Sequence, residues 1–183
     1  MELTNSLEEY IKTKKKSGIT ATNLKENDGL ASVDLIKDEP IILLTKQGQA
    51  ICFNSTEITP TSRNTSGIKG ISLKDGDEIV DALIIRDSTD LLAIFSEKGL
   101  GKKIPLKELA LQHRGGKGII CYKPTATSGE VIAGALLADS DNILICGNNS
   151  SIYISSSEIP ILGRTSIGNQ IIKNNNIVSI SKV

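Results

Sequence analysis

Short aliphatic runs interrupted by turn residues dominate this chain from about residue 40 to its end. In residues 41–53 one run, IILLT, is followed by a turn at Gly48 and by a second run, QAICF. The same order returns in residues 91–106 and 142–154. Two short apolar runs joined by a tight turn predict a β-hairpin. The pattern therefore predicts three hairpins and an all-β fold.

Each predicted hairpin precedes a polar stretch, a third apolar run, a turn and a fourth apolar run. This order predicts four short strands in a unit of roughly fifty residues, which is the size of a propeller blade. The third strands are expected in residues 66–73, 116–123 and 167–173. The fourth strands are expected in residues 79–86, 131–138 and 177–183.

Four glycines recur about every fifty residues, and their neighbours recur with them, which indicates a repeated supersecondary unit. The glycines, which are expected to have a left-handed backbone, are Gly18, Gly67, Gly118 and Gly168. Ten residues before each glycine is a glutamate: Glu8, Glu57, Glu108 and Glu158. Four residues before each is a basic residue: Lys14, Arg63, Arg114 and Arg164. Nineteen residues before the last three are the residues that best tolerate positive φ: Gly48, Gly99 and Asn149.

The chain is expected to form a single repeat domain that begins in the middle of a unit and makes an open, partial propeller. Residues 5–15 also have the composition of a short helix capped by Asn5 or Ser6, but their place in the repeat favours the polar stretch that precedes a third strand. The expected boundaries within residues 1–183 are a half unit at 1–36 and fuller units at 37–89, 90–140 and 141–183.

Charge is balanced over the whole chain but not along it. There are 21 basic and 21 acidic residues, which argues against a protein that coats nucleic acid uniformly. However, residues 98–123 contain seven Lys or Arg residues and one glutamate, whereas residues 74–90 contain six acidic residues and two basic ones. This segregation predicts a local basic surface.

Cysteine usage and hydropathy indicate an intracellular, soluble protein. The three cysteines, Cys52, Cys121 and Cys146, are far apart, have no metal-binding spacing and are expected to be buried, reduced thiols. No apolar run approaches the roughly 18 residues of a membrane span.

Several longer motifs point to one family. They are ILLTKQGQAICF followed by TSRNTSGIKGISL, SEKGLGKKIPLKEL followed by RGGKGI, and SEIPILGRTSIGNQII. In these motifs, and over nearly its whole length, the chain resembles the C-terminal domain of the A subunit of DNA gyrase or topoisomerase IV. The segment QHRGGKG, residues 112–118, is similar to the family's gyrase box, QRRGGKG, with His113 in place of an arginine. The family has this box in its first blade, whereas this copy lies in the next-to-last unit, so it is either the box itself or one of the degenerate versions that later blades of the family carry.

The resemblance implies a β-pinwheel, in which propeller-like blades exchange strands and bend duplex DNA around a basic outer rim. It implies as partners double-stranded DNA, the remainder of the A subunit, and the ATPase subunit, in the bacterial cytoplasm at the nucleoid and without a membrane. It implies no cofactor for this chain, because ATP and Mg²⁺ are used by other parts of the holoenzyme. None of Tyr10, Tyr122 and Tyr153 matches the catalytic tyrosine motif, so this chain alone is not expected to cleave DNA.

The candidate DNA-binding residues are basic or glycine-rich positions near the repeat glycines. Lys and Arg neutralise phosphates, and glycine N–H groups form anion-binding nests. Because stacking aromatics, a recognition helix and a zinc site are lacking, nearly sequence-neutral binding is expected. The candidates are Lys14, Arg63, Lys69, Lys102, Lys103, Gln112, His113, Arg114, Gly115, Gly116, Lys117 and Arg164.

Alternatives remain open for the residues and for the function. The repeated arginines could instead donate to carbonyls of a neighbouring blade, and the repeated glutamates are better explained by structure, because acids on a DNA rim would repel phosphate. His113 lies in no nucleophile motif and GLGKK lacks P-loop spacing, so a small-molecule enzyme is the least supported function. The other functions are a topoisomerase IV-type domain that recognises DNA crossings and a protein-binding module without DNA affinity.

Overall fold

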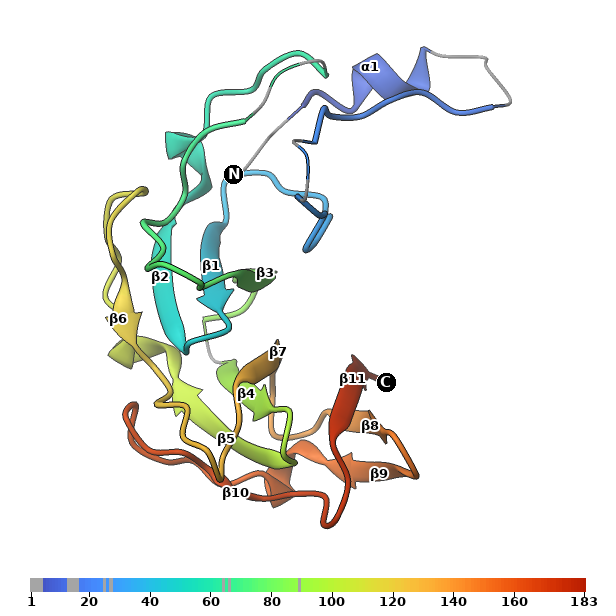
Figure 1. The fold of residues 1–183 in the computed structure, drawn as a ribbon. Helices are drawn as coiled ribbons and strands as arrows, with labels where there is room; N and C mark the ends of the chain where they lie inside the picture. Colours follow the sequence, from blue (N-terminus) through green and yellow to red (C-terminus); the bar gives the residue numbers. More distant parts are fainter. Residues whose placement is uncertain are drawn as a thin grey trace.

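Three antiparallel β-sheets follow one another along an arc in the computed structural model of the chain (Figure 1). The structure describes residues 5–12, 17–24, 26, 28–63, 65, 67–88 and 90–183. The prediction of an all-β fold built from hairpins is confirmed. Among the described residues, no helix is long and apolar enough to span a bilayer.

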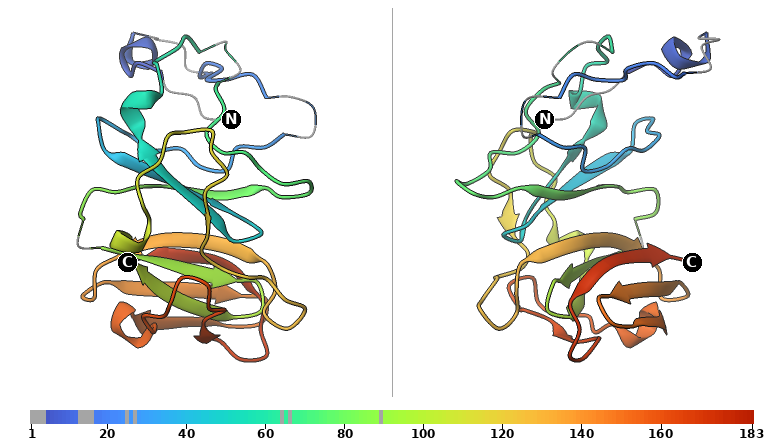
Figure 2. Two further views of the ribbon diagram at one scale, coloured as in Figure 1. Left: turned by 90° about the vertical axis from the view of Figure 1, so that its left-hand side faces the viewer. Right: turned by 45° about the vertical axis from the view of Figure 1, so that its right-hand side comes forward.

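Each sheet is built on one hairpin and on the fourth strand of the same unit, as predicted. The first sheet contains β1 (Pro40–Thr45), β2 (Gln49–Asn54) and β3 (Ile79–Ile84). The second contains β4 (Leu91–Ser96), β5 (Leu100–Pro105) and β7 (Val131–Leu137). The third contains β8 (Asn142–Gly147), β9 (Ser151–Ser155) and β11 (Ile177–Lys182). The fourth strands β3, β7 and β11 line the inner side of the arc (Figures 1 and 2).

The third strand of a unit pairs with the sheet of the preceding unit. β6 (Ile119–Ile120) pairs with β2, and β10 (Asn169–Gln170) pairs with β5. This is the strand exchange that the resemblance implies. β6 and β10 have two residues each, far fewer than predicted. After β6 the chain turns to the tip of the first hairpin, where the Cys121 and Tyr122 N–H groups donate to the Gly48 carbonyl. Of residues 67–73, which the structure describes, only Ile68 forms a bridge.

Short helical turns follow the second strand of each hairpin and contain the repeated glutamates. They are η1 (Ser55–Glu57), η2 (Leu106–Glu108) and η3 (Ser156–Glu158). The corresponding segment near the N-terminus forms α1 (Glu8–Ile11), so the short helix, which was the less favoured alternative, is present at the position of these turns in the repeat. The N-cap is Leu7, not Asn5 or Ser6, and it makes no capping hydrogen bond through its side chain. Glu8 nevertheless occupies the helical turn that the repeat assigns to it.

The repeat glycines have the predicted left-handed backbone, with φ of 73° at Gly18, 69° at Gly67, 68° at Gly118 and 84° at Gly168. The same prediction for Asn149 is wrong, because this residue does not have positive φ. The third hairpin turn is one residue shorter than the first, as shown by the closing pairs Cys146↔Ser151 and Leu44↔Ala50. The shorter turn has no equivalent of the left-handed position.

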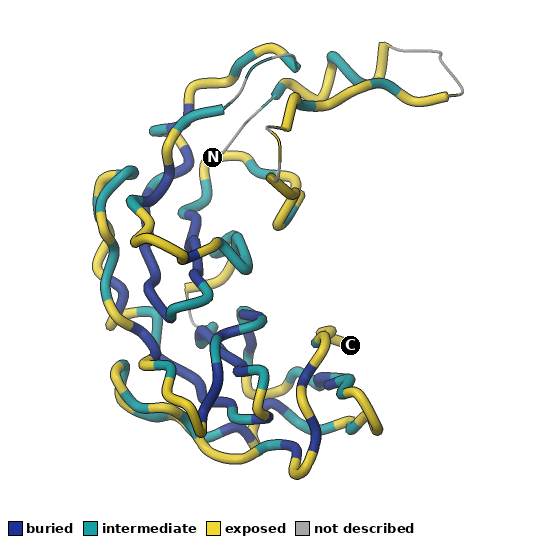
Figure 3. The backbone as a smooth tube through the Cα atoms, in the orientation of Figure 1, coloured by how far each residue is buried: buried dark blue, intermediate teal, exposed yellow. Residues whose placement is uncertain are grey.

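The hydrophobic core is distributed between the sheets. One cluster lies between the first and second sheets and a second between the second and third, while a third cluster covers the other face of the first hairpin. In β1, Ile42 and Leu44 belong to one cluster and Ile41 and Leu43 to another, so both faces are buried (Figure 3). Burial on both faces explains why the hairpins read as continuous apolar runs.

Candidate nucleic-acid interface

The glycine-rich loop at residues 112–118 is fixed on the preceding unit by its backbone. The Gln112 N–H donates to the Cys52 carbonyl at 2.8 Å. Ser72 donates twice, from its N–H to the Gly116 carbonyl and from its Oγ to the Gly115 carbonyl, both at 2.8 Å. Gly118 then has no room for a side chain, because an added Cβ would lie 2.5 Å from the Ala50 carbonyl oxygen. The loop therefore has a defined shape before any ligand binds.

The three repeated arginines make the same contact at successive positions along the arc. Each donates from Nη1 to a backbone carbonyl two residues after the repeat glycine of the preceding unit. The pairs are Arg63 with Thr20 at 3.0 Å, Arg114 with Lys69 at 2.9 Å, and Arg164 with Ile120 at 2.6 Å. These contacts support the interpretation that the arginines join neighbouring units, and the three arginines are half-buried residues.

Lys102 is buried. The prediction that Lys102 contacts DNA at the surface is therefore wrong. Its ammonium group donates to the carbonyls of Gly163, Arg164 and Ser166 at 3.1, 2.7 and 2.7 Å. Nζ also lies 6.0 Å from the centre of the Tyr122 ring. Burial lowers the pKa of Lys102 to about 8 from its ordinary 10.5. The ammonium group holds a loop of the following unit against β5 and is not available to a phosphate.

Lys103 is also buried, at 1% exposure, and its prediction as a DNA contact is wrong for the same reason. Its Nζ is 2.7 Å from Asp139 Oδ1 and 3.3 Å from Ser156 Oγ. Alternation along β5 directs Lys102 and Lys103 to opposite faces of the strand, and both faces are covered by other parts of the protein. The basic total of residues 98–123 therefore overstates the surface charge.

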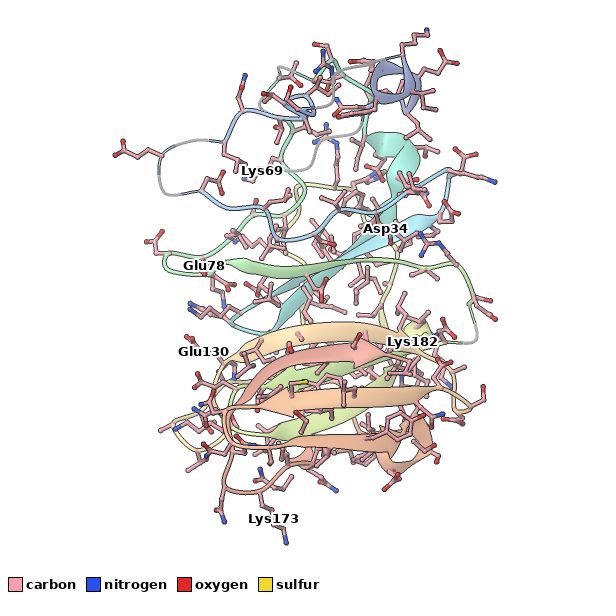
Figure 4. The ribbon with its side chains drawn as sticks, turned by 90° about the vertical axis from the view of Figure 1, so that its right-hand side faces the viewer. Asp34, Lys69, Glu78, Glu130, Lys173 and Lys182 are labelled. Carbon is pink, nitrogen blue, oxygen red and sulfur yellow. The ribbon has the colours of Figure 1, made fainter. Side chains whose placement is uncertain are left out.

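The exposed cations of the candidate interface are Lys69 and Lys117, together with the exposed His113. Lys69 lies beside the 112–118 loop, since its carbonyl accepts the Arg114 bond, and its side chain is seen in Figure 4. The candidates Gln112, Gly115 and Gly116 are half-buried. Lys14 lies outside the described residues. The structure thus brings part of the predicted set together around one loop.

The repeated glutamates have structural contacts. Glu57 accepts from the Arg114 N–H at 3.2 Å, lies 3.5 Å from His113 Nδ1, and receives the Arg114 Nε–H on its backbone carbonyl. Glu158 completes a capping box with Ser155 at the start of η3. Both contacts agree with the structural interpretation of these positions.

Acidic residues near the fourth strands hold the hairpin tips. Asp77 Oδ1 accepts from the Gln47 N–H at 2.9 Å. Lys46 Nζ lies 3.9 Å from Glu78 and 3.4 Å from Glu130, and these two acids lie at corresponding ends of β3 and β7 (Figure 4). Part of the acidic segment is therefore used within the fold, in contacts with the hairpin tip.

A joint is the contact between a loop of one unit and the sheet of the preceding unit. Sequence reasoning missed the side chains that complete these joints. Gln49 Nε2 donates to the Lys117 carbonyl at 3.0 Å, and Gln170 Nε2 donates to the Lys98 carbonyl at 3.0 Å. Ser72 and the two glutamines do not recur at one offset from the repeat glycines, so the period contained no signal for them.

Comparison with known proteins supports the same fold and family. The family described as "DNA gyrase C-terminal domain, beta-propeller" matches residues 5–37, 39–86, 90–139 and 147–179. The chain belongs to this family. The resemblance inferred from the sequence motifs, and the β-pinwheel that it implies, are thereby confirmed.

Two similar relatives are the DNA gyrase A subunits of Lawsonia intracellularis, 35% identical over 90% of this chain, and of Clostridium acetobutylicum, 36% identical over 92%. The chain spans about a fifth of their length, 20% and 21% respectively. Among solved structures, the DNA gyrase A C-terminal domain has a TM-score of 0.84 at 31% identity, with coverage of 91% of this chain and 58% of that one. The topoisomerase IV C-terminal domain has a TM-score of 0.89 at 25% identity, with coverage of 95% and 56%.

Proposed function

We propose that this chain binds and bends duplex DNA as part of the C-terminal domain of the A subunit in a bacterial type IIA topoisomerase of the gyrase type. The observation that carries the proposal is the 112–118 loop, which is held on the preceding unit, with the exposed Lys117 in the loop and the exposed Lys69 beside it. Its similarity to the gyrase box and the membership in the gyrase C-terminal family support the same role. In this proposal the other parts of the enzyme cleave DNA and use ATP and Mg²⁺, and the complex acts in the cytoplasm at the nucleoid.

The repeat architecture suits a curved polyanion. Equivalent loops recur along an arc, and Arg63, Arg114 and Arg164 fix the spacing of the units by carbonyl contacts. The exposed Lys69 and Lys117, which come from two successive units, then neutralise phosphates of a bent duplex. Since the contacts are made to phosphates, binding is nearly independent of DNA sequence.

The test is duplex binding by fluorescence anisotropy between about 50 and 200 mM salt, where a protein with several phosphate contacts loses affinity steeply. The variant Lys69→Glu/Lys117→Glu should bind more weakly and with a shallower salt dependence, by about 0.9 in the log–log slope for each phosphate that is no longer neutralised. Lys37→Glu/Lys74→Glu changes the charge equally at two exposed lysines outside the candidate set and is the matched control.

Two results would contradict the proposal. Affinity that does not respond to salt would show that phosphates are not the ligand. Equal losses in the site and control variants would show that net charge alone, and not the 112–118 loop, attracts DNA. DNA bending is measured separately, as energy transfer between dyes at the ends of a duplex, and is expected to increase on binding.

A further inference from the structure

The outer edge of β9 lacks the strand that completes the other two sheets. β2 pairs with β6 and β5 with β10, whereas within the described part of the chain β9 pairs only with β8. Tyr153 corresponds to Cys52 and Lys103 by its pairing within the hairpin. It is 60% exposed, compared with 4% and 1% for those residues. At this end of the arc, within the described residues, β9 is therefore a hairpin strand to which no strand of a following unit is paired.

The other end of the arc has a segment, beginning at Gly18, that corresponds to the segments forming β6 and β10. Gly18 has φ of 73°, like Gly118 and Gly168, which directly precede β6 and β10. An added Cβ would lie 2.5 Å from a carbonyl oxygen at Gly118 and 2.7 Å at Gly168, but among the described residues it meets nothing within 4 Å at Gly18. The donor geometry is present at Gly18 while the accepting strand is not against it.

The donor segment is also held in position by the repeat contact. The Thr20 carbonyl accepts from Arg63 at 3.0 Å, just as the Ile120 carbonyl of β6 accepts from Arg164. Thr22 Oγ1 donates to the Thr65 carbonyl at 3.4 Å. The segment is therefore presented as β6 is, at the opposite end of the arc from β9 (Figure 1).

We propose that two copies of this chain associate head to tail, with Ile19 and Thr20 of one copy pairing with the β9 edge of the next. The register follows from the two joints within the chain, in which Ala50 pairs with Ile119 and Gln49 with Ile120. Applied to the third hairpin, it pairs Ser151, the first residue of β9, with Ile19, and Ser150, the residue before β9, with Thr20. The joined surfaces are unlike, so the contact is heterologous and leads to rings or open chains of molecules. This inference does not depend on DNA binding.

The first test is the mass of the purified 183-residue chain in solution by light scattering across a wide concentration range, without DNA. Association to at least twice the mass of one chain is expected. Gly18→Ala should raise the concentration of half-association by roughly tenfold or more, because the new Cβ would meet the accepting carbonyl. Gly76→Ala is the matched control, because Gly76 also has φ of 73° and nothing within 4 Å.

The second test fixes the register. Copies with Thr20→Cys are mixed with copies with Ser150→Cys under oxidising conditions, and a disulfide between copies is expected, because directly opposed residues lie within disulfide reach. Lys69→Cys, at the same offset after Gly67, replaces Thr20→Cys as the control, and the unmodified chain controls for the native thiols. A chain that stays monomeric at every concentration overturns the proposal. So does crosslinking through Lys69→Cys as efficient as through Thr20→Cys.

Discussion

The joint between the first and second sheets and the joint between the second and third use the same glycine and arginine but different closing side chains. In the first joint, Ser72 donates to the carbonyls of Gly115 and Gly116. In the second, the Lys102 ammonium group donates to three loop carbonyls. By strand register, the first-joint equivalent of Lys102 is Ile51, which is fully buried.

This difference shows that a joint has two separate requirements: the geometry between neighbouring units and hydrogen-bond donors for the covered loop carbonyls. The glycine and the arginine set the distance and orientation of neighbouring units, and they recur because that geometry recurs. Carbonyls in a covered loop must find donors, but the donor is interchangeable, since a hydroxyl and an N–H serve in one joint and an ammonium in the other. A lysine used in this way contributes no charge to the outer surface, so the two joints differ in what they offer to a phosphate.

The largest expected effect comes from the shared glycine. Gly118→Ala should lower the free energy of unfolding by about 2 to 4 kcal/mol, because it combines positive φ with a Cβ placed 2.5 Å from the Ala50 carbonyl oxygen. Gly76→Ala has the same backbone problem in open space and should cost about 1 kcal/mol. Urea denaturation of both variants measures the difference. Equal losses would show that the joint does not depend on close approach.

The next largest expected effect is a pH dependence of the free energy of unfolding, which arises in the joint between the second and third sheets alone. The pKa of Lys102 is lowered by burial to about 8 in the folded chain, whereas it is near 10.5 when unfolded. Between these values the unfolded chain binds more protons, so stability rises with pH in this window. Relative to Lys102→Met, the unmodified chain should gain on the order of 2 kcal/mol from about pH 7 to 10.

Comparison with the Lys102→Met variant is needed because buried thiols change the stability of the fold with pH in the opposite direction. Burial raises the pKa of Cys121 to about 12, so above the ordinary thiol pKa the folded chain binds more protons and loses stability as pH rises. Cys121 is present in both chains and its contribution largely cancels in the difference. Parallel pH profiles of the two chains would contradict the burial of the Lys102 ammonium group.

The smallest effect is expected in the first joint. Ser72→Ala removes the 2.8 Å bond from Oγ to the Gly115 carbonyl but keeps the backbone N–H donor, so it should cost about 1 kcal/mol. Ser140→Ala, at an exposed turn, is the control and should change stability by less than about 0.5 kcal/mol. Thermal unfolding of the two variants measures the comparison. A loss as large as that of Gly118→Ala would mean that Ser72 contributes more than one hydrogen bond.

Sequence reasoning succeeded where the signal is local and repeated. The hairpins, the inner strands and the left-handed glycines each depend on a few adjacent residues, and four copies made their period visible. It failed for the length of the third strands and for Lys102 and Lys103, because these depend on how far the neighbouring unit covers the backbone. A lysine in a strand has the same sequence signature whether its end reaches water or a carbonyl from the next unit.

The sequence alone therefore determined the repeat, the all-β class and the family, because short apolar runs, turn residues and local motifs lie within single units. Only the tertiary structure decided which positive charges remain at the surface. Arg114 and Lys102 are directed to backbone carbonyls of neighbouring units, while Lys69 and Lys117 remain exposed around the glycine-rich loop. The physical reason is that covered carbonyls need donors, and strand exchange between units brings those carbonyls to residues about fifty positions away in the chain.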